Sequence, residues 1–274
     1  MKKIIALLMV IAMVLGFAAC GETETSSGAG AAAQELIVGF DAEFPPFGYV
    51  AEDGKGVYEK YDGFDLALAK ELCNRLGWTF KAVAIDWDSK DAELKTGNIN
   101  CIWNGFTYTG REDEYTWSDP YVDNSIVLVV KADSGIKTKA DLAGKSVMAQ
   151  KESSAADALE SEDNKDFTST LKEVVQLADY NAGFLDLAQG AVDAVAADLG
   201  VAKYQMSKNE GQYVILDEPV STEQYAVGFL KGNTELRDKV NAELLKMAED
   251  GTMMEIAKNY EDEGLVLDSL CLCK

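Results

Sequence analysis

Short apolar segments typical of β-strands alternate with amphipathic segments typical of α-helices along most of the chain. The apolar run 36–40 precedes residues 63–77, where apolar side chains recur at a spacing of four (Phe64, Leu68, Leu72 and Leu76). This spacing predicts a helix with one buried face, which Gly77 ends. Further strands are expected at 78–85, 99–103, 125–131, 147–150, 173–177, 192–197 and 224–231, and further helices at 88–96, 153–161, 180–189, 198–208 and 234–249. Such alternation predicts an α/β fold.

The length and composition favour a globular protein of two domains. The chain has 274 residues, against roughly 100–200 residues per domain. No repeat and no change of composition divides it, so a chain with two domains would cross between them within strands. With 47 acidic and 25 basic residues, the formal net charge is −22. This charge argues against binding to nucleic acid and against electrostatic attachment to an anionic membrane.

The sequence contains no histidine. This excludes Ser-His-Asp and Cys-His catalysis and histidine-ligated metal sites. The absence of histidine does not exclude enzymes that use carboxylates or lysine. The acidic run 160–166 lacks the ligand spacing and glycine of a calcium loop, so we expect a solvated surface there. No cofactor and no bound metal are predicted.

The N-terminal segment has the features of an export signal. Lys2 and Lys3 precede the uncharged, apolar run 4–19, which is short for a membrane span but suits a signal peptide. Small residues before Cys20 resemble a bacterial lipobox, although Phe17 replaces the usual leucine. We therefore expect a signal peptide at 1–19, then a lipidated Cys20 and a flexible tether within 20–34. A secretory signal with an incidental cysteine is the alternative.

The other cysteines are Cys73, Cys101, Cys271 and Cys273. Cys73 and Cys101 fall in a helical and a strand-like pattern, which favours buried thiols. The spacing of Cys271 and Cys273 is not that of a zinc site. Exported proteins can form disulfides, and four cysteines permit three pairings between which the sequence does not choose.

A series of short motifs in a fixed order carries a resemblance to a known family. The motifs are Phe44-Pro45-Pro46-Phe47, Gly63-Phe64-Asp65-Leu66, Thr107 with Thr109 and Arg111, Trp117-Ser118-Asp119-Pro120-Tyr121, Asp141-Leu142-Ala143-Gly144-Lys145 before Val147 and Gln150, Gly190-Ala191-Val192-Asp193-Ala194-Val195 before Asp198, and Asn241 with Asp250-Gly251-Thr252. From about Leu36 to Tyr260, the chain resembles the solute-binding proteins of polar amino-acid ABC transporters. That group includes glutamine-, histidine- and lysine/arginine/ornithine-binding proteins.

The resemblance implies a two-lobed periplasmic-binding-protein fold of type II. Lobe 1 would comprise 35–127 and 227–274, and lobe 2 would comprise 128–226. The predicted strands 125–131 and 224–231 would cross between the lobes, and the ligand would lie in the cleft. A protein of this family would be anchored by its lipid on the extracytoplasmic face of the bacterial cell membrane. Its partners would be a free amino acid and the subunits of an ABC permease, and we expect a monomer.

The chemistry of an amino acid dictates what the cleft must contain. Both the carboxylate and the ammonium lose water on closure, so each needs a charged or hydrogen-bonding partner. The resemblance assigns the carboxylate to Arg111, whose planar guanidinium suits it, and to Ser154 or Ser153. It assigns the ammonium to Thr107, the Gly105 carbonyl and Asp198, and it places Gln150 in the site.

Two departures from the family pattern affect this part of the site. The stretch before Arg111 is one residue shorter than in the family. Glu152-Ser153-Ser154 also stands where the family often has a glycine and a threonine. Arg111 stays the candidate because no other basic residue lies between it and Trp117.

Selectivity for the ligand's side chain is assigned by the same resemblance. Asp41 would contact that side chain, and Phe44 and Trp87 would be aromatic walls. Three further candidates are Glu43, Trp103 and Asn104. An acid at position 41 favours a side chain that bears a hydrogen-bond donor, so we expect a polar amino acid with an amide or cationic group.

Other functions compete with amino-acid capture. Cyclohexadienyl dehydratases resemble these binding proteins, and Glu152 would be the candidate acid of such an enzyme. A sensor that reports its ligand to a membrane partner is a third possibility. The fragments Ser134–Lys137 and Lys95–Gly97 match motifs of penicillin-binding enzymes, but they occur in the reverse order and Lys95 falls at a helix end. We expect a binding protein and not an enzyme.

Overall fold

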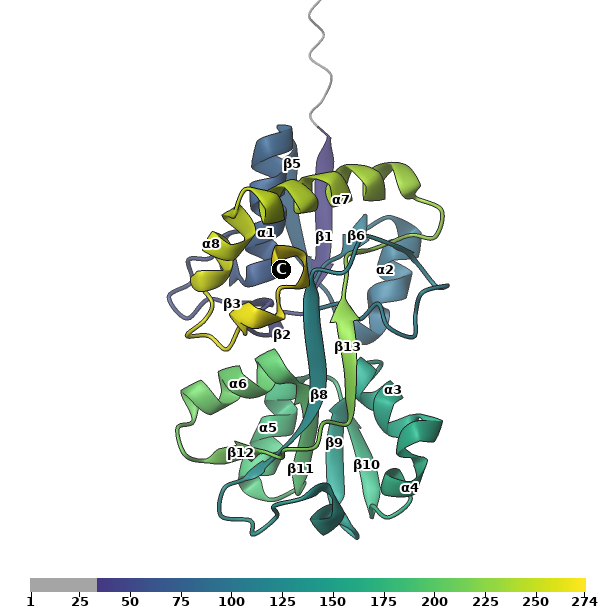
Figure 1. Cartoon of the computed structure of the whole chain (residues 1–274), viewed down its shortest axis with the longest axis vertical. Coiled ribbons are helices and arrows are strands. Elements are labelled where there is room, and N and C mark those ends of the chain that lie inside the picture. The colour runs from purple at the N-terminus through teal and green to yellow at the C-terminus, as the bar shows by residue number, and fades with distance from the viewer. Residues whose placement is uncertain (1–33) are drawn as a thin grey trace, which may run out of the picture. The chain divides into compact units, whose positions relative to one another are not determined.

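The computed structural model describes residues 34–274. The predicted signal peptide, Cys20 and the tether up to residue 33 lie outside the described residues. The predicted α/β fold is confirmed: the described chain builds two large sheets, each flanked by helices (Figure 1), and one small sheet.

The first sheet contains both early and late parts of the chain. Its strands are β1 (Glu35–Phe40), β5 (Thr79–Ala84), β6 (Cys101–Ile102), β7 (Thr116–Trp117) and β14 (Gly228–Phe229). Their order is β5-β1-β6-β14-β7, with β1 parallel to β5 and β6, and β14 antiparallel to β6 and β7. Leu36, Val38 and Phe40 of β1 are fully buried. The associated helices are α1 (Phe64–Leu76), α2 (Lys90–Thr96), α7 (Thr234–Glu249) and α8 (Thr252–Lys258).

The second sheet is built from the middle of the chain. Its strands are β8 (Val122–Lys131), β9 (Ser146–Gln150), β10 (Glu173–Leu177), β11 (Ala194–Asp198), β12 (Tyr213–Ile215) and β13 (Ser221–Tyr225). The order is β10-β9-β11-β8-β12, and β13 pairs with the other end of β8. The helices are α3 (Ser154–Glu160), α4 (Lys165–Thr168), α5 (Tyr180–Gln189) and α6 (Leu199–Lys208).

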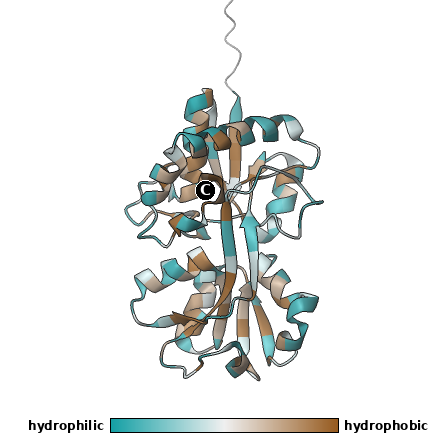
Figure 2. Ribbon diagram, viewed as in Figure 1, coloured by the Kyte–Doolittle hydropathy of each residue, from teal (hydrophilic) through white to brown (hydrophobic). Residues whose placement is uncertain are grey.

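The strands β8 and β13 run side by side between the two sheets (Figure 1). They are antiparallel, and Glu223 lies opposite Asn124. The polar residues Asp123, Asn124 and Ser125 occupy the crossing, and the apolar remainder of β8 enters the second sheet, as the change of colour along β8 in Figure 2 shows. The predicted lobe limits after residues 127 and 226 stay a prediction.

One sequence-based expectation about the crossing strands was wrong. Residues 224–231 do not form a single strand: β13 ends at Tyr225 and β14 begins at Gly228. The chain leaves the ladder with β8 there and pairs instead with β6 and β7, so its hydrogen-bond partners change between the two segments. The first crossing strand also begins at Val122, three residues earlier than predicted.

Small elements without clear periodicity were not predicted. They include the three-stranded sheet β2 (Glu43–Phe44), β3 (Gly48–Val50) and β4 (Tyr61–Asp62), and the one-turn helices η1 (Trp87–Ser89), η2 (Lys139–Leu142), η3 (Glu162–Asn164), η4 (Leu267–Ser269) and η5 (Cys271–Cys273). The small sheet follows β1 directly and carries Phe44, so it positions a predicted site residue.

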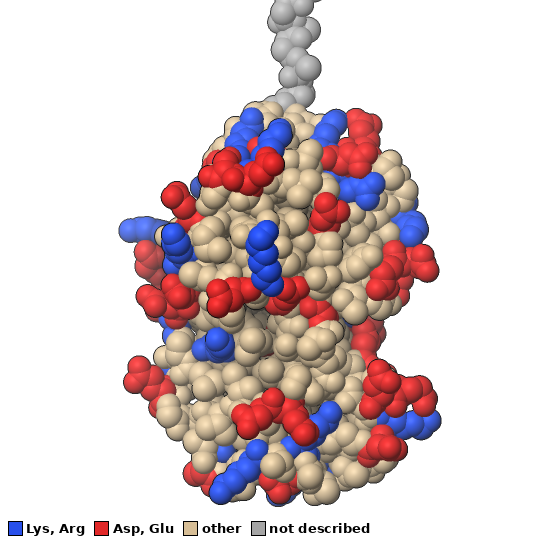
Figure 3. Space-filling view, in the orientation of Figure 1, with Lys and Arg blue, Asp and Glu red and all other residues tan. Residues whose placement is uncertain are grey.

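Apolar side chains fill the interiors around both large sheets, where Figure 2 shows many brown segments on the strands. Charged side chains of both signs are scattered over the face that Figure 3 shows. Cys73 and Cys101 are buried, as predicted, and all four cysteines between residues 34 and 274 are free thiols. Within the same residues, no helix is both long and apolar enough to cross a membrane.

Candidate functional site

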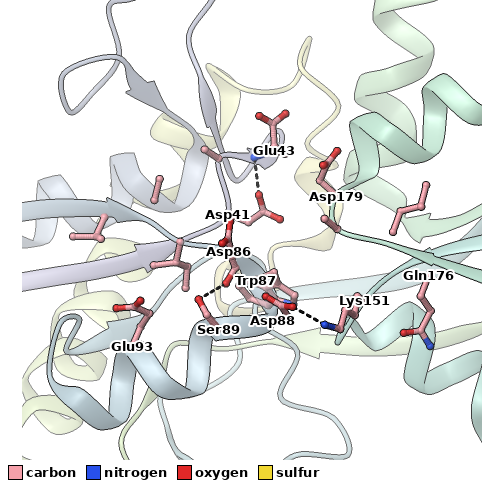
Figure 4. A pocket seen from close by; sticks show the side chains of 16 residues that line it. Asp41, Glu43, Asp86, Trp87, Asp88, Ser89, Glu93, Lys151, Gln176 and Asp179 are labelled. Atoms are coloured by element: carbon pink, nitrogen blue, oxygen red, sulfur yellow. Dashed lines mark hydrogen bonds and ion pairs between the residues drawn. The ribbon is translucent and has the colours of Figure 1, made fainter.

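A cavity of about 730 Å³ lies where the first and second sheets approach each other. One wall comes from the residues after β1 and β5, and the other from the ends of β9 and β10 (Figure 4). Asp41 and Trp87 line the first wall, and Lys151 and Asp179 line the second. Of the predicted site residues, Asp41 and Trp87 therefore share this cavity, together with the further candidate Glu43.

Carboxylates dominate the charged lining of this cavity. They belong to Asp41, Glu43, Asp86, Asp88, Glu93 and Asp179. Lys151 is the basic residue of the lining, and its Nζ lies 2.7 Å from the Asp88 carboxylate. Burial raises the pKa of Asp41 to about 6, and burial followed by the charge of Asp179 raises the pKa of Glu43. The cavity therefore favours a positively charged or donor-bearing group.

Asp41 connects the two walls. Gln150 Nε2 donates to the Asp41 carboxylate at 2.6 Å and to the Ala178 carbonyl at 2.9 Å. The Asp41 N–H donates to Asn104 Oδ1 at 2.9 Å. Gln150 at the end of β9 thus lies against Asp41 at the end of β1, as expected if both belong to one site.

The predicted aromatic walls are both buried. Phe44 packs against Phe47 and Tyr180, at ring-centroid distances of 5.8 and 6.0 Å. Trp87 meets Phe106 edge to face at 5.6 Å. The Lys90 ammonium lies 5.2 Å from a Trp87 ring centroid and donates to the Glu152 carbonyl at 3.2 Å. Trp103, in contrast, is fully buried and packs on Tyr121, as a core side chain does.

Arg111 lines another cavity, of about 720 Å³, together with Ser154, Asp157 and Glu223. Its Nη2 lies 2.6 Å from the carboxylate of Asp157, which α3 contributes. Its guanidinium also lies over the Phe106 ring at 5.6 Å. Arg111 therefore lines one cavity with Ser154, and its guanidinium already donates to a carboxylate from the opposite side of the cleft.

Two of the residues predicted for the ligand's ammonium lie at a pair of buried carboxylates: Asp198 is one of the pair, and Thr107 donates to the other, Glu223. Asn124 Nδ2 donates to Asp198 at 2.8 Å and to Glu223 at 2.9 Å. Thr107 Oγ1 and Ser154 Oγ donate to Glu223 at 3.0 and 3.2 Å. Burial raises the pKa of both acids, and the charge of Asp198 raises the pKa of Glu223 further.

Gly105 and Ser153 hold structural positions beside these groups. The Gly105 N–H donates to the buried Asp65 at 2.6 Å, and Tyr121 donates to the same oxygen at 2.8 Å. Ser153 is the N-cap of α3: its hydroxyl accepts from the Ala156 N–H and donates to the Gln150 carbonyl. Ser154, one residue later, points to Glu223 and the second cavity instead.

The predicted residues therefore form two groups. Asp41 and Trp87 line the first cavity, and Gln150 donates to Asp41 beside it. Thr107, Arg111, Ser154 and Asp198 surround the second cavity or the acid pair beside it. Phe44 and Gly105 pack against each other between the elements, and Ser153 caps a helix.

Several polar residues of the site were missed by sequence reasoning. They are Asp65, Lys90, Asn124, Tyr180, Glu223 and Tyr225. The alternation of β13 could have indicated Glu223 and Tyr225, since both point to the buried side of that strand. Nothing local marks Lys90, which is buried beside Trp87 and donates to the Glu152 carbonyl from the other side of the cleft. Among the described residues, no group of His, Cys, Asp and Glu could hold a metal ion.

Comparisons with known proteins agree with this architecture. The L-cystine-binding protein TcyA of Bacillus subtilis is 29% identical over 278 residues, covering 97% of this chain and 99% of that protein. The arginine-binding extracellular protein ArtP of the same species is 28% identical over 271 residues, covering 95% and 98%.

Solved structures with the same fold include an ABC uptake transporter substrate-binding protein from Streptococcus pneumoniae with bound histidine. It is 32% identical, with a TM-score of 0.78 and coverage of 85% of this chain and 94% of that one. An ancestral arginine-binding protein bound to arginine is 34% identical, with a TM-score of 0.74 and coverage of 84% and 99%. The predicted two-lobed fold of type II periplasmic binding proteins is thereby confirmed. Residues 36–263 match the bacterial extracellular solute-binding proteins of family 3, and the chain belongs to that family.

Proposed function

We propose that this protein is the extracytoplasmic substrate-binding lipoprotein of an ABC importer and captures an amino acid with a cationic side chain by cleft closure. Relatives named for binding cystine, arginine and histidine support the amino-acid class. Cys20 would carry the lipid that holds the protein at the outer face of the cell membrane. The protein would act as a monomer and deliver its ligand to the permease subunits.

The acidic cavity beside Trp87 is the observation that supports a cationic side chain on the ligand. Asp41, Glu43 and Asp179 face it without a basic partner within 4 Å among the described residues, and the one basic residue of its lining is already paired with Asp88. Gln150 is the donor that now meets Asp41. A guanidinium or ammonium of the ligand would replace Gln150 as the donor to Asp41. It would also add a positive charge, which stabilises a buried carboxylate more than a neutral donor does. Trp87 supplies the aromatic surface along which the alkyl part would lie.

The ligand's carboxylate would bind on the Arg111 side. The Arg111 guanidinium already donates to the carboxylate of Asp157 across the cleft, which supports this assignment. That acid is 64% exposed at its side chain, so a ligand can displace it into solvent. Lys90 adds a second buried positive charge nearby, and no ion pair among the described residues includes it. Burial lowers the pKa of Lys90, and the positive charge of Arg111 lowers it further.

L-Cystine is a second candidate because it has two zwitterionic ends. The observation that favours it is Lys151, which lines the acidic cavity and could receive the second carboxylate while Asp41 or Asp179 receives the second ammonium. Lysine, arginine and ornithine have nothing for Lys151 to bind.

We expect no catalysis at this site. The relatives above are binding proteins, and Glu152, the candidate acid of a dehydratase, has an exposed side chain and lines neither the acidic cavity nor that of Arg111. A role in sensing would use the same site and the same ligand.

A thermal-shift screen tests the proposal. The fragment 21–274 is unfolded, dialysed and refolded to remove bound ligand, then mixed with the twenty amino acids, ornithine, cystine and prephenate. At a hundredfold excess over the dissociation constant, a ligand stabilises the fold by about 2.7 kcal/mol. We expect the largest shifts with arginine, lysine or ornithine. A shift with cystine alone would select the second candidate, and a shift with prephenate alone would overturn the binding-protein proposal.

Asp41 provides the matched test of side-chain selection. Arginine and citrulline have nearly the same shape but differ in charge. Asp41→Asn should reduce the preference for arginine over citrulline roughly tenfold or more, since a buried charge pair is lost. Asp166→Asn, at an exposed position of α4, is the control. An unchanged preference in Asp41→Asn would refute the role of this acid.

A further inference from the structure

The Glu223 carboxylate is held from both sides of the cleft and from the strand between them. Thr107 follows β6 of the first sheet, Asn124 lies on β8, and Ser154 begins α3 of the second sheet. All three side chains donate to the same oxygen, Oε1, at 3.0, 2.9 and 3.2 Å. Only 7% of Glu223 is exposed. The position of this carboxylate therefore depends on how closely the two sides approach.

Glu223 and Asp198 form a buried pair of acids without a positive partner among the described residues. Both carboxylates lie within 3 Å of Asn124 Nδ2. Within residues 34–274, no Lys or Arg nitrogen lies within 4 Å of either acid. Two carboxylates that share one donor in a buried site do not both ionise readily, which favours retention of a proton on one of them until a cation arrives.

The two acids differ in their access to the cavities. Asp198 Oδ1 accepts from Asn124 and Tyr225, and Oδ2 accepts from Tyr180 at 3.1 Å. Asp198 lines neither neighbouring cavity. Glu223 lines both the cavity of Arg111 and another of about 430 Å³ beside Asn124. Glu223 thus presents the carboxylate that an incoming group would meet.

We infer that Glu223 is a direct counter-ion of the ligand's α-ammonium, and that Asp198, which shares the Asn124 donor with it, is the second carboxylate of the same site. The inference rests on the proposed amino-acid-binding function and names a residue of that same site. On binding, the ligand ammonium donates to the Glu223 carboxylate, and the proton that the acid pair held leaves for solvent. Binding of one zwitterion is therefore coupled to the release of a proton.

The charged and titratable groups around Glu223 are consistent with this coupling. Asp198 of β11, Tyr180 of α5 and Tyr225 of β13 face the pair from its buried side. Arg111 and Asp157 face it across the second cavity, where they pair with each other. Asp123 lines the 430 Å³ cavity and is paired with Lys274. Burial, followed by the charge of Asp198, raises the pKa of Glu223 and so disfavours its ionised form.

Calorimetry with refolded 21–274, which contains the whole compact unit 33–274, tests the inference. L-Arginine is titrated at about pH 7 in phosphate and in Tris, whose different ionisation enthalpies reveal the protons released. If the screen selects another amino acid, that amino acid and its desamino analogue are used. Wild type should release protons on binding L-arginine and should release fewer on binding δ-guanidinovalerate, which lacks the α-amino group.

Variants separate Glu223 from general effects. Glu223→Gln should bind L-arginine roughly 30-fold or more weakly, without proton release, because the ammonium loses a buried charge partner. Its affinity for δ-guanidinovalerate should stay near that of wild type, which also shows that the variant is folded. Glu235→Gln, an exposed acid paired with Lys239, is the matched control and should behave as wild type in all titrations.

The outcomes distinguish this inference from the function on which it rests. If wild type binds no amino acid, the proposed function fails, and the role of Glu223 fails with it. If wild type binds L-arginine and Glu223→Gln binds it equally well with the same proton release, the assignment of Glu223 alone is wrong. Equal proton release by wild type with L-arginine and δ-guanidinovalerate would overturn it as well, without reference to any variant.

Discussion

The ring of Phe44 packs directly on the backbone of Gly105. A Cβ atom at position 105 would lie 2.7 Å from Phe44 Cε1 and 3.1 Å from a carbon of the Tyr225 ring. Gly105 also has a φ of +55°, in the left-handed region that favours glycine. Close packing and backbone conformation therefore both require glycine at this position. Phe44 is a predicted aromatic wall of the cleft, and the Gly105 carbonyl is predicted to bind the ligand's ammonium.

Gly105→Ala should lower the free energy of unfolding by about 2–4 kcal/mol, since overpacking adds to the left-handed conformation. Gly110→Ala is the matched control: Gly110 has a φ of +84°, but apart from Gly110 and its two chain neighbours no described atom lies within 4 Å of the position that a Cβ atom would take there. That variant should lose only about 1 kcal/mol. Urea unfolding measures both, and equal losses would show that Phe44 and Tyr225 move aside.

Arg111→Met should weaken binding of L-arginine a hundredfold or more, because the ligand carboxylate loses its charged partner. The Met side chain keeps an apolar contact with Phe106. Agmatine, which is arginine without its carboxylate, should bind wild type and the variant alike. Arg237→Met is the control, since Arg237 pairs with Asp238 and the Trp117 carbonyl and lines neither cleft cavity. An equal loss of agmatine binding would contradict a carboxylate-specific role.

Asp65 should make the protein less stable as the pH rises. Burial raises its pKa to about 7, so between about pH 4 and pH 7 the folded protein keeps a proton that the unfolded chain has lost. The free energy of unfolding therefore falls through this window, by about 1.4 kcal/mol for each unit by which the pKa is raised. Asp41, whose pKa is about 6, acts in the same direction.

Asp65→Asn removes this titration and keeps an oxygen for the Gly105 N–H. In urea unfolding, wild type should lose more stability than Asp65→Asn between about pH 5 and about pH 7.5. In Asp65→Asn, the remaining dependence of the free energy of unfolding on pH comes from Asp41 and the other buried acids. Parallel pH profiles for the two proteins would show that Asp65 is ionised throughout.

Glu152→Gly should stabilise the fold by about 0.5–1 kcal/mol. Glu152 has a φ of +57°, a conformation that costs roughly 1 kcal/mol for a residue other than glycine. Glu59, with a φ of +53°, is a matched second site, and Glu59→Gly should behave similarly. If Glu152→Gly lowers the free energy of unfolding and Glu59→Gly does not, the exposed Glu152 side chain must itself stabilise the fold.

Cys20→Ser should release the protein from cells into the medium, since the predicted lipid attachment is lost. Cell fractionation followed by immunoblotting measures the distribution. Cys271→Ser is the control, because Cys271 is a free thiol of the described residues and should leave the protein in the membrane fraction. Membrane retention of Cys20→Ser would contradict lipid anchoring.

The sequence by itself determined most helices and strands of the two sheets. The four-residue spacing in 63–77 predicted α1 with its end at Gly77, and the β-branched run 125–131 predicted most of β8. A helix or strand is recognised by which of its faces is buried. The spacing of apolar residues along the sequence indicates that face directly. The ordered motifs also indicated the family, because they cover nearly the whole chain beyond the predicted tether.

Tertiary structure alone decided which polar side chains meet. Gln150 and Asp41 are 109 residues apart, and Glu223 and Thr107 are 116 residues apart. Their contacts follow from sheet order, from the pairing of β8 with β13 and from the approach of the two sheets. Periodicity contains none of this, since it describes an element and not its neighbours. For the same reason Asp198 was predicted from a motif, whereas its tyrosine partners and the carboxylate of Glu223 beside it emerged only when the strands were brought together.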